Sequence, residues 1–87
     1  MTLDSVFKKY IKEISKEVDD KTPLYMENGH FVYNIYGEVD KELINDIIDD
    51  VADVITDVLY DLTSILYDEE VVSNFLKKKN IIKFIKN

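Results

Sequence analysis

The chain of 87 residues carries a net charge of −7 at neutral pH, and 46% of its residues are hydrophobic. This composition supports one packed core and excludes a disordered chain. Cysteine is absent, which predicts no disulfide, no thiolate metal site and a cytoplasmic location. No apolar run reaches the ~20 residues of a membrane span, so we expect a single small domain over residues 1–87 that does not enter a membrane.

The first predicted element is an amphipathic helix from Leu3 to Val18. Its apolar residues recur at steps of three and four, and lysines take the opposite face. Thr2 has the side chain of an N-cap residue. Proline disfavours a helical conformation at the residue before it, so we expect "DDKTP", which ends at Pro23, to end this helix.

The next stretch, "LYMENGHFVYNIY", predicts a β-hairpin. Asn28-Gly29 is the favoured pair for a two-residue type I′ turn, because both positions need a positive φ. That turn places Met26 opposite Phe31. One face of the hairpin is then largely apolar, and we expect it to pack on the long helix that follows through Val51, Ile55, Val58 and Leu62. This face consists of Leu24, Met26, Phe31, Tyr33 and Ile35.

The long helix is expected to begin after Asp40, a good N-cap residue, and to run to about Leu66. "YDEE" (67–70) predicts a bend, and a shorter helix follows from Val71 to about Lys79. The tail "NIIKFIKN" fits an edge strand beside the hairpin and equally a continued helix. The predicted fold class is therefore α+β: an N-terminal helix, a hairpin with or without a third C-terminal strand, a long amphipathic acidic helix and a short C-terminal helix.

Charge is distributed unevenly along the chain. Residues 42–76 contain 10 acidic residues and no lysine or arginine, whereas residues 77–87 contain 5 lysines and no acidic residue. All basic residues are lysine, and arginine is the preferred side chain for bidentate contacts to phosphates and bases. The acidic balance and the missing arginine argue against direct binding of nucleic acid.

Six aspartates occupy the side of the long helix opposite its apolar face. We name them the aspartate ridge: Asp46, Asp49, Asp50, Asp53, Asp57 and Asp61. Four pairs among them lie at the i,i+4 spacing, where like charges repel. A face that serves only solubility is expected to mix charges, so the ridge has two interpretations: an ordinary solvated face, or a binding surface that forgoes ~1–3 kcal/mol of helix stability.

The spacing of the ridge favours a particular partner. At 1.5 Å per residue it presents one charge per ~4 Å, close to the ~3.4 Å between phosphates of one nucleic-acid strand. We therefore expect the ridge to imitate a phosphate backbone and to bind a basic protein, namely a nucleic-acid-binding enzyme or complex. Tyr60 and Tyr67 are expected to add aromatic contact area to this interface.

No catalytic, metal-binding or cofactor-binding pattern accompanies these features, so we expect a protein that is not an enzyme. His30 is the single histidine and adjoins the hairpin turn. The paired carboxylates lie on a convex helix face and not in a cleft that would shift a pKa. Both glycines are accounted for by turns, which leaves no loop that cradles a phosphate.

In general character the chain is similar to the small acidic inhibitors that phages and mobile elements use against host nucleic-acid-binding enzymes, and to small immunity proteins and antitoxins. The similarity is one of composition and size. An alternative function is open as well, because the apolar arc of the long helix is wide. A structural or assembly protein that homodimerises through this helix face would have the same pattern.

Overall fold

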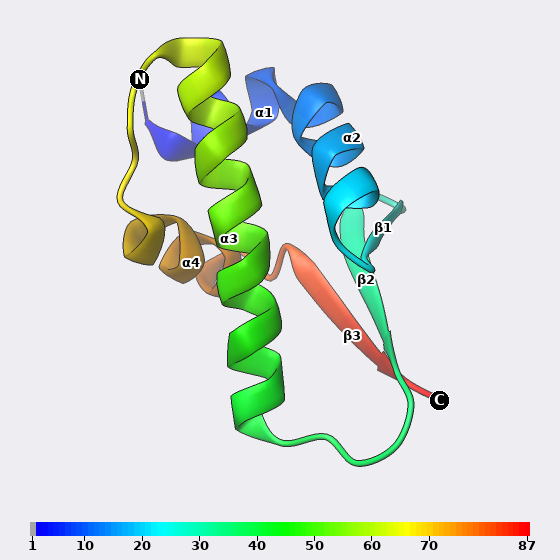
Figure 1. Cartoon of the computed structure of the whole chain (residues 1–87). Helices are drawn as coiled ribbons and strands as arrows, with labels where there is room; N and C mark the ends of the chain where they lie inside the picture. Colours follow the sequence, from blue (N-terminus) through cyan, green and yellow to red (C-terminus); the bar gives the residue numbers. More distant parts are fainter. Residues whose placement is uncertain (1) are drawn as a thin grey trace.

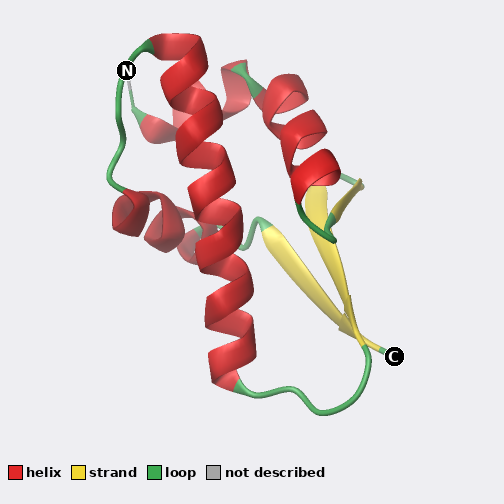
Figure 2. Cartoon of the chain, in the orientation of Figure 1, coloured by secondary structure: helices red, strands yellow, loops and turns green. Residues whose placement is uncertain are grey.

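The computed structural model describes residues 2–87 and shows the predicted α+β fold. The helices are α1 (Leu3–Lys9), α2 (Ile11–Lys21), α3 (Lys41–Thr63) and α4 (Glu69–Lys78). The strands are β1 (Tyr25–Glu27), β2 (His30–Ile35) and β3 (Ile82–Lys86). The long helix α3 lies between α2 and α4, and the strands form a separate layer to one side of it (Figures 1 and 2).

The predicted N-terminal helix is divided into two. Thr2 caps α1, and its Oγ1 accepts a hydrogen bond of 3.2 Å from the amide of Ser5. The chain then bends at Tyr10, whose φ of −109° and ψ of 24° are not helical. The bend turns α1 away from α2, so that Phe7 lies within aromatic contact of Phe31 and Phe75, at centroid distances of 6.5 and 5.5 Å. The prediction of one continuous helix was wrong here.

The second part, α2, continues three residues beyond the predicted end at Val18 and stops at Lys21, within the stretch that ends at Pro23. Thr22, the residue before the proline, is extended with φ −132° and ψ 163°. Ile14 and Val18 are fully buried on the face toward the core. The positions of these two side chains show that the predicted apolar face is the one that packs.

The hairpin has the predicted register. Met26 lies opposite Phe31, and Glu27 lies opposite His30. Asn28 and Gly29 have φ values of 50° and 81°, so both turn residues take the positive φ that a type I′ turn requires.

The tail forms a strand, which settles the open alternative. β3 pairs in parallel with β2, in a sheet of order β1-β2-β3. Phe31 lies opposite Ile82 and Tyr33 opposite Phe84, and the rings of the latter pair are 6.2 Å apart. The β-branched residues of the tail favour this strand, and its side chains extend the apolar face of the hairpin.

Helix α3 forms the centre of the core. Val51, Ala52 and Ile55 are fully buried and belong to one cluster with Leu24 and Phe31. The predicted contact between hairpin and long helix is therefore confirmed for the middle of α3. The remaining buried members of the cluster are Val6, Phe7, Ile14, Val18, Ile47, Ile48, Val58, Leu59, Val72 and Leu76.

The end of α3 differs from the prediction. The helix stops at Thr63 because Ser64 adopts a left-handed conformation with a φ of 61°. Leu62, predicted to pack on the hairpin, is 40% exposed, and Ile65 and Leu66 lie outside the helix with exposures of 52% and 74%. These three residues lie beyond the part of α3 that its neighbours cover.

Helix α4 begins at Glu69, two residues before the predicted start. Asp68 is its N-cap, and its Oδ1 accepts a hydrogen bond of 2.8 Å from the amide of Glu70. Acidic residues occupy the first turn and lysines the last, as the helix dipole favours. None of the helices in residues 2–87 combines the length and the apolar character that crossing a bilayer requires.

Candidate protein-interaction surface

The aspartate ridge lies on the solvent side of α3. Asp40 starts the helix by accepting a hydrogen bond of 2.7 Å from the amide of Leu43. The buried residues from Ile47 to Leu59 then hold one face of α3 against the core. This fixes the opposite face in water, and all six aspartates of the ridge are exposed there.

The ridge is broader than a single line, because its members face two different neighbours. Asp49 faces α4, where the Ser73 hydroxyl donates a hydrogen bond of 3.0 Å to its Oδ1. Asp57 and Asp61 face α2 and line a groove with Lys16 and Lys21. The ridge is therefore a strip along α3, flanked by both of the helices that pack beside it.

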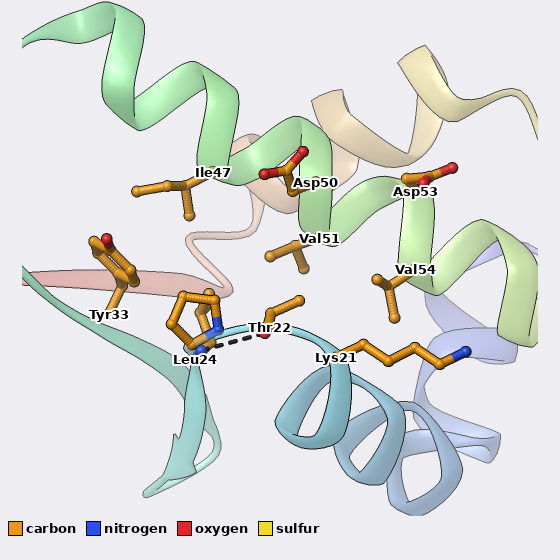
Figure 3. A pocket seen from close by; sticks show the side chains of 10 residues that line it. Lys21, Thr22, Leu24, Tyr33, Ile47, Asp50, Val51, Asp53 and Val54 are labelled. Carbon is orange, nitrogen blue, oxygen red and sulfur yellow. Dashed lines mark hydrogen bonds between the residues drawn. The ribbon is translucent and has the colours of Figure 1, made fainter.

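Asp50 and Asp53 lie at a shallow cavity of about 380 Å³ beside the end of α2. Figure 3 shows Val51 directed toward the Thr22–Leu24 segment and Val54 directed toward Lys21. Both aspartates are exposed at the mouth of this cavity. Among the residues that line this cavity, the only carboxylates are those of Asp50 and Asp53, so the cavity brings no acidic group from another element against the ridge.

The charges of the ridge are not neutralised by close lysines. Residues 2–87 form two ion pairs, one within α1 and one within α2, and neither includes the ridge. In α2, Lys21 Nζ lies 3.1 Å from Glu17 Oε2. The hydrogen bond and charge of Glu17 raise the pKa of Lys21, and Asp57 and Asp61 add smaller contributions through space. The charges of Asp57 and Asp61 thus act on Lys21 although neither aspartate forms an ion pair with it.

The structure adds Glu69, which the sequence did not place at this surface. Glu69 is exposed, and some loss of hydration raises the pKa of its carboxyl, which the charges of Asp53 and Asp49 raise further. Glu69 is in the first turn of α4, so the packing of α4 on α3 brings it to the ridge. A run of acidic residues after a helix cap was the available signal, but only the tertiary contact decides which way it faces.

The two tyrosines proposed for the interface have different environments. Tyr60 is 51% exposed, on the same side of α3 as the ridge. Tyr67 lies in the connection to α4, where it is half-buried and packs against the core. Tyr60 therefore offers a free aromatic surface, whereas Tyr67 also has a structural contact.

Three exposed aliphatic residues lie at and just after the end of α3, on other sides of the chain than Tyr60. We name them the α3 end patch: Leu62, Ile65 and Leu66, with exposures of 40%, 52% and 74%. Sequence periodicity placed the three aliphatic residues in the buried arc. The left-handed conformation of Ser64, which ends the helix, has no comparable sequence signal.

The described residues give little evidence for a metal site or for a chemical role of the single histidine. Across residues 2–87, no three carboxylate or histidine side chains converge to hold a metal ion. His30 is exposed, and its Nδ1 lies 3.2 Å from the carbonyl oxygen of Asn28 in the hairpin turn. This contact is local to the hairpin turn, since the two residues are only two positions apart.

Comparisons with known proteins give no information on function, so the function is argued from the geometry described above. No protein-family model, curated protein or solved structure matches the chain.

Proposed function

We propose that the chain is a small acidic protein-interaction module, without catalytic activity, that inhibits a basic nucleic-acid-binding protein by imitating a phosphate backbone. The observation that carries the proposal is the aspartate ridge: six exposed carboxylates on one helix, none of them in an ion pair within residues 2–87. A surface of one charge sign steers a partner of opposite sign and raises the association rate. Phages and mobile elements use small acidic inhibitors in this way, and we place the protein in the cytoplasm.

The packing of α3 on the core holds the ridge in a fixed arrangement. Its residues lie on a helix whose opposite face is fully buried at Val51, Ala52, Ile55 and Leu59. A rigid helix holds the carboxylates at a fixed spacing before binding, so little side-chain or backbone ordering opposes association. A flexible acidic tail has the same charge but lacks this geometry.

The second candidate is an assembly protein that homodimerises through α3. Most of the wide apolar face is used within the chain, which restricts a dimer contact to the α3 end patch. Sedimentation of the isolated protein across a range of concentrations separates the candidates. A stable dimer without affinity for any basic partner favours assembly.

The test of the main proposal neutralises the ridge without changing its shape. Asp46→Asn, Asp50→Asn, Asp53→Asn and Asp57→Asn are combined in one variant. A matched control removes the same charge elsewhere through four exposed acidic residues: Asp19→Asn, Asp20→Asn, Glu27→Gln and Glu38→Gln. Both variants should fold, because every changed side chain is exposed.

A nucleic-acid-binding protein captured from the native host is the partner to be measured, after purification, in competition with DNA or RNA. The ridge variant should associate more slowly and show a weaker dependence on salt, because exposed interface charges act mainly on encounter. Tyr60→Ala should instead increase the dissociation rate. Unchanged affinity of the ridge variant at low salt would leave the ridge as a solvated face and refute the proposal.

A further inference from the structure

The hairpin turn contains the only Asn-Gly pair of the sequence, Asn28-Gly29. Both residues are exposed, and a Cβ atom built on Gly29 meets nothing within 4 Å. The backbone nitrogen of Gly29 donates no hydrogen bond within residues 2–87. The side-chain amide of Asn28 has no partner there either, because the contact of this residue with His30 uses its main-chain carbonyl oxygen. An amide carbon and a free backbone nitrogen are therefore neighbours at an open turn.

The asparagine that resembles Asn28 most in backbone conformation is Asn80. Its φ of 51° matches the 50° of Asn28. However, Asn80 is followed by Ile81, whose backbone nitrogen donates a hydrogen bond of 3.2 Å to the carbonyl oxygen of Leu76. The β-branched side chain of Ile81 is also stiff and bulky next to that nitrogen. The two positions therefore share a conformation and differ in the freedom of the nitrogen that follows.

We propose that Asn28 is a site of spontaneous deamidation, in which the backbone nitrogen of Gly29 attacks the side-chain amide carbon Cγ. A bond from this nitrogen to Cγ forms as the bond from Cγ to Nδ2 breaks. Nδ2 leaves as ammonia and takes the proton of the attacking nitrogen, which leaves a succinimide ring. Water then opens the ring at either of its carbonyl carbons, and the ring nitrogen regains a proton. The products are aspartate and isoaspartate, and water is the only co-reactant.

Glycine favours this reaction in two ways. It has no Cβ atom that would shield the attacking nitrogen, and it permits the rotation of the backbone that ring closure requires. The other asparagines inside regular elements lack this freedom, because main-chain hydrogen bonds fix the backbone of a strand or helix. They are Asn34 in β2, Asn45 in α3 and Asn74 in α4.

The two products have different effects on the fold. Aspartate keeps the turn, since Asp-Gly is also a favoured pair for type I′. Isoaspartate directs the main chain through Cβ and Cγ, which lengthens the turn by one atom. Turn geometry determines the register of a hairpin, and here the register places Met26 opposite Phe31, a side chain that is 1% exposed. A reaction at the exposed tip thus acts on the packing of the core.

The experiment incubates the intact protein in native buffer and follows its peptides by mass spectrometry. Replacement of the NH₂ group by OH should accumulate at Asn28, while Asn80 should stay unmodified over the same time. An isoaspartate-specific methyltransferase should label the peptide that contains position 28. After chromatographic separation, the isoaspartate form should have a lower melting temperature than the unmodified protein.

Two variants assign the reaction to its site. Asn28→Asp should remove the mass gain at the turn and melt as the wild-type protein does, because the turn keeps a favoured pair. Asn80→Asp is the matched control at the other asparagine with a positive φ. This control should leave the conversion of Asn28 unchanged.

Three outcomes overturn the inference. Equal conversion of Asn28 and Asn80 shows that the free nitrogen and the glycine do not select the site. Conversion of the urea-unfolded chain without conversion of the native protein shows that the folded turn protects Asn28. An isoaspartate form as stable as the unmodified protein shows that the tip does not act on the core. None of these results involves the aspartate ridge, so the proposed function is judged separately.

Discussion

The middle and the C-terminal end of the apolar face of α3 follow the same sequence pattern and have opposite environments. Ile55 and Leu59 are fully buried, whereas Leu62 is 40% exposed although it continues the same three- and four-residue spacing. The difference arises from the neighbours. Side chains from α1, α2, α4 and the sheet form one core cluster with α3 as far as Leu59. An amphipathic period therefore defines a face, but the extent of the covering elements decides how much of it becomes core.

The strongest test of this comparison replaces a leucine by alanine in each of the two parts of the helix face, Leu59 in one variant and Leu62 in another. Leu59→Ala should lower the free energy of unfolding by ~2–5 kcal/mol, the range for a fully buried leucine. Leu62→Ala should cost less than ~1 kcal/mol, because much of its side chain remains in water. Urea unfolding of the two variants measures both values. Similar losses would mean that Leu62 is covered in solution, and that the middle and the C-terminal end of the face do not differ.

A smaller effect concerns the residue at which the helix ends. Ser64 has a φ of 61°, a conformation that costs a residue with a Cβ atom free energy that glycine avoids. Ser64→Gly should therefore stabilise the fold by up to ~1 kcal/mol. Asn80→Gly is the control, since Asn80 has a similar φ of 51° and asparagine tolerates this region better. Thermal unfolding should show a larger gain at Ser64. A loss of stability there would show that the serine is not strained.

The smallest effect is a pH dependence at the middle of α3, where Glu69 adjoins the ridge. The pKa of Glu69 is raised in the folded state, by loss of hydration first and then by the charges of Asp53 and Asp49. The folded protein therefore holds this proton more tightly than the unfolded chain, and stability falls as pH rises through the raised pKa. Mild acidification from neutral pH should raise the melting temperature slightly, because solvent screens the effect.

Glu69→Gln should reduce that gain, since it removes the titrating group. Glu70→Gln is the matched control on the same helix turn and should retain the gain of the wild-type protein. Equal behaviour of the two variants would show that Glu69 is not coupled to the ridge.

The sequence predicted those parts of the fold that depend on local chemistry. The Asn28-Gly29 pair determines the turn and hence the register, and Thr2 and Asp40 cap helices as their side chains allow. The exposure of the ridge also follows from the helical period. The bend at Tyr10 did not follow from it, because the apolar period continues through the bend.

Tertiary contacts account for the remaining differences. The tail has residues suited to a strand, but its parallel pairing with β2 requires the helices between them to be in place. Likewise, Glu69 joins the ridge only because α4 packs beside α3. The α3 end patch was missed since a repeated spacing does not indicate where the covering elements stop.

The parallel pairing of β2 and β3 has a consequence for the order of folding. The hairpin closes over two residues and belongs to the contacts that form within ~1–10 μs. By contrast, the pairing of Phe31 with Ile82 closes a loop that contains all of α3 and α4. Loop-closure entropy opposes such a contact until the intervening helices have collapsed. We therefore expect the third strand to dock after the hairpin and the helices have formed.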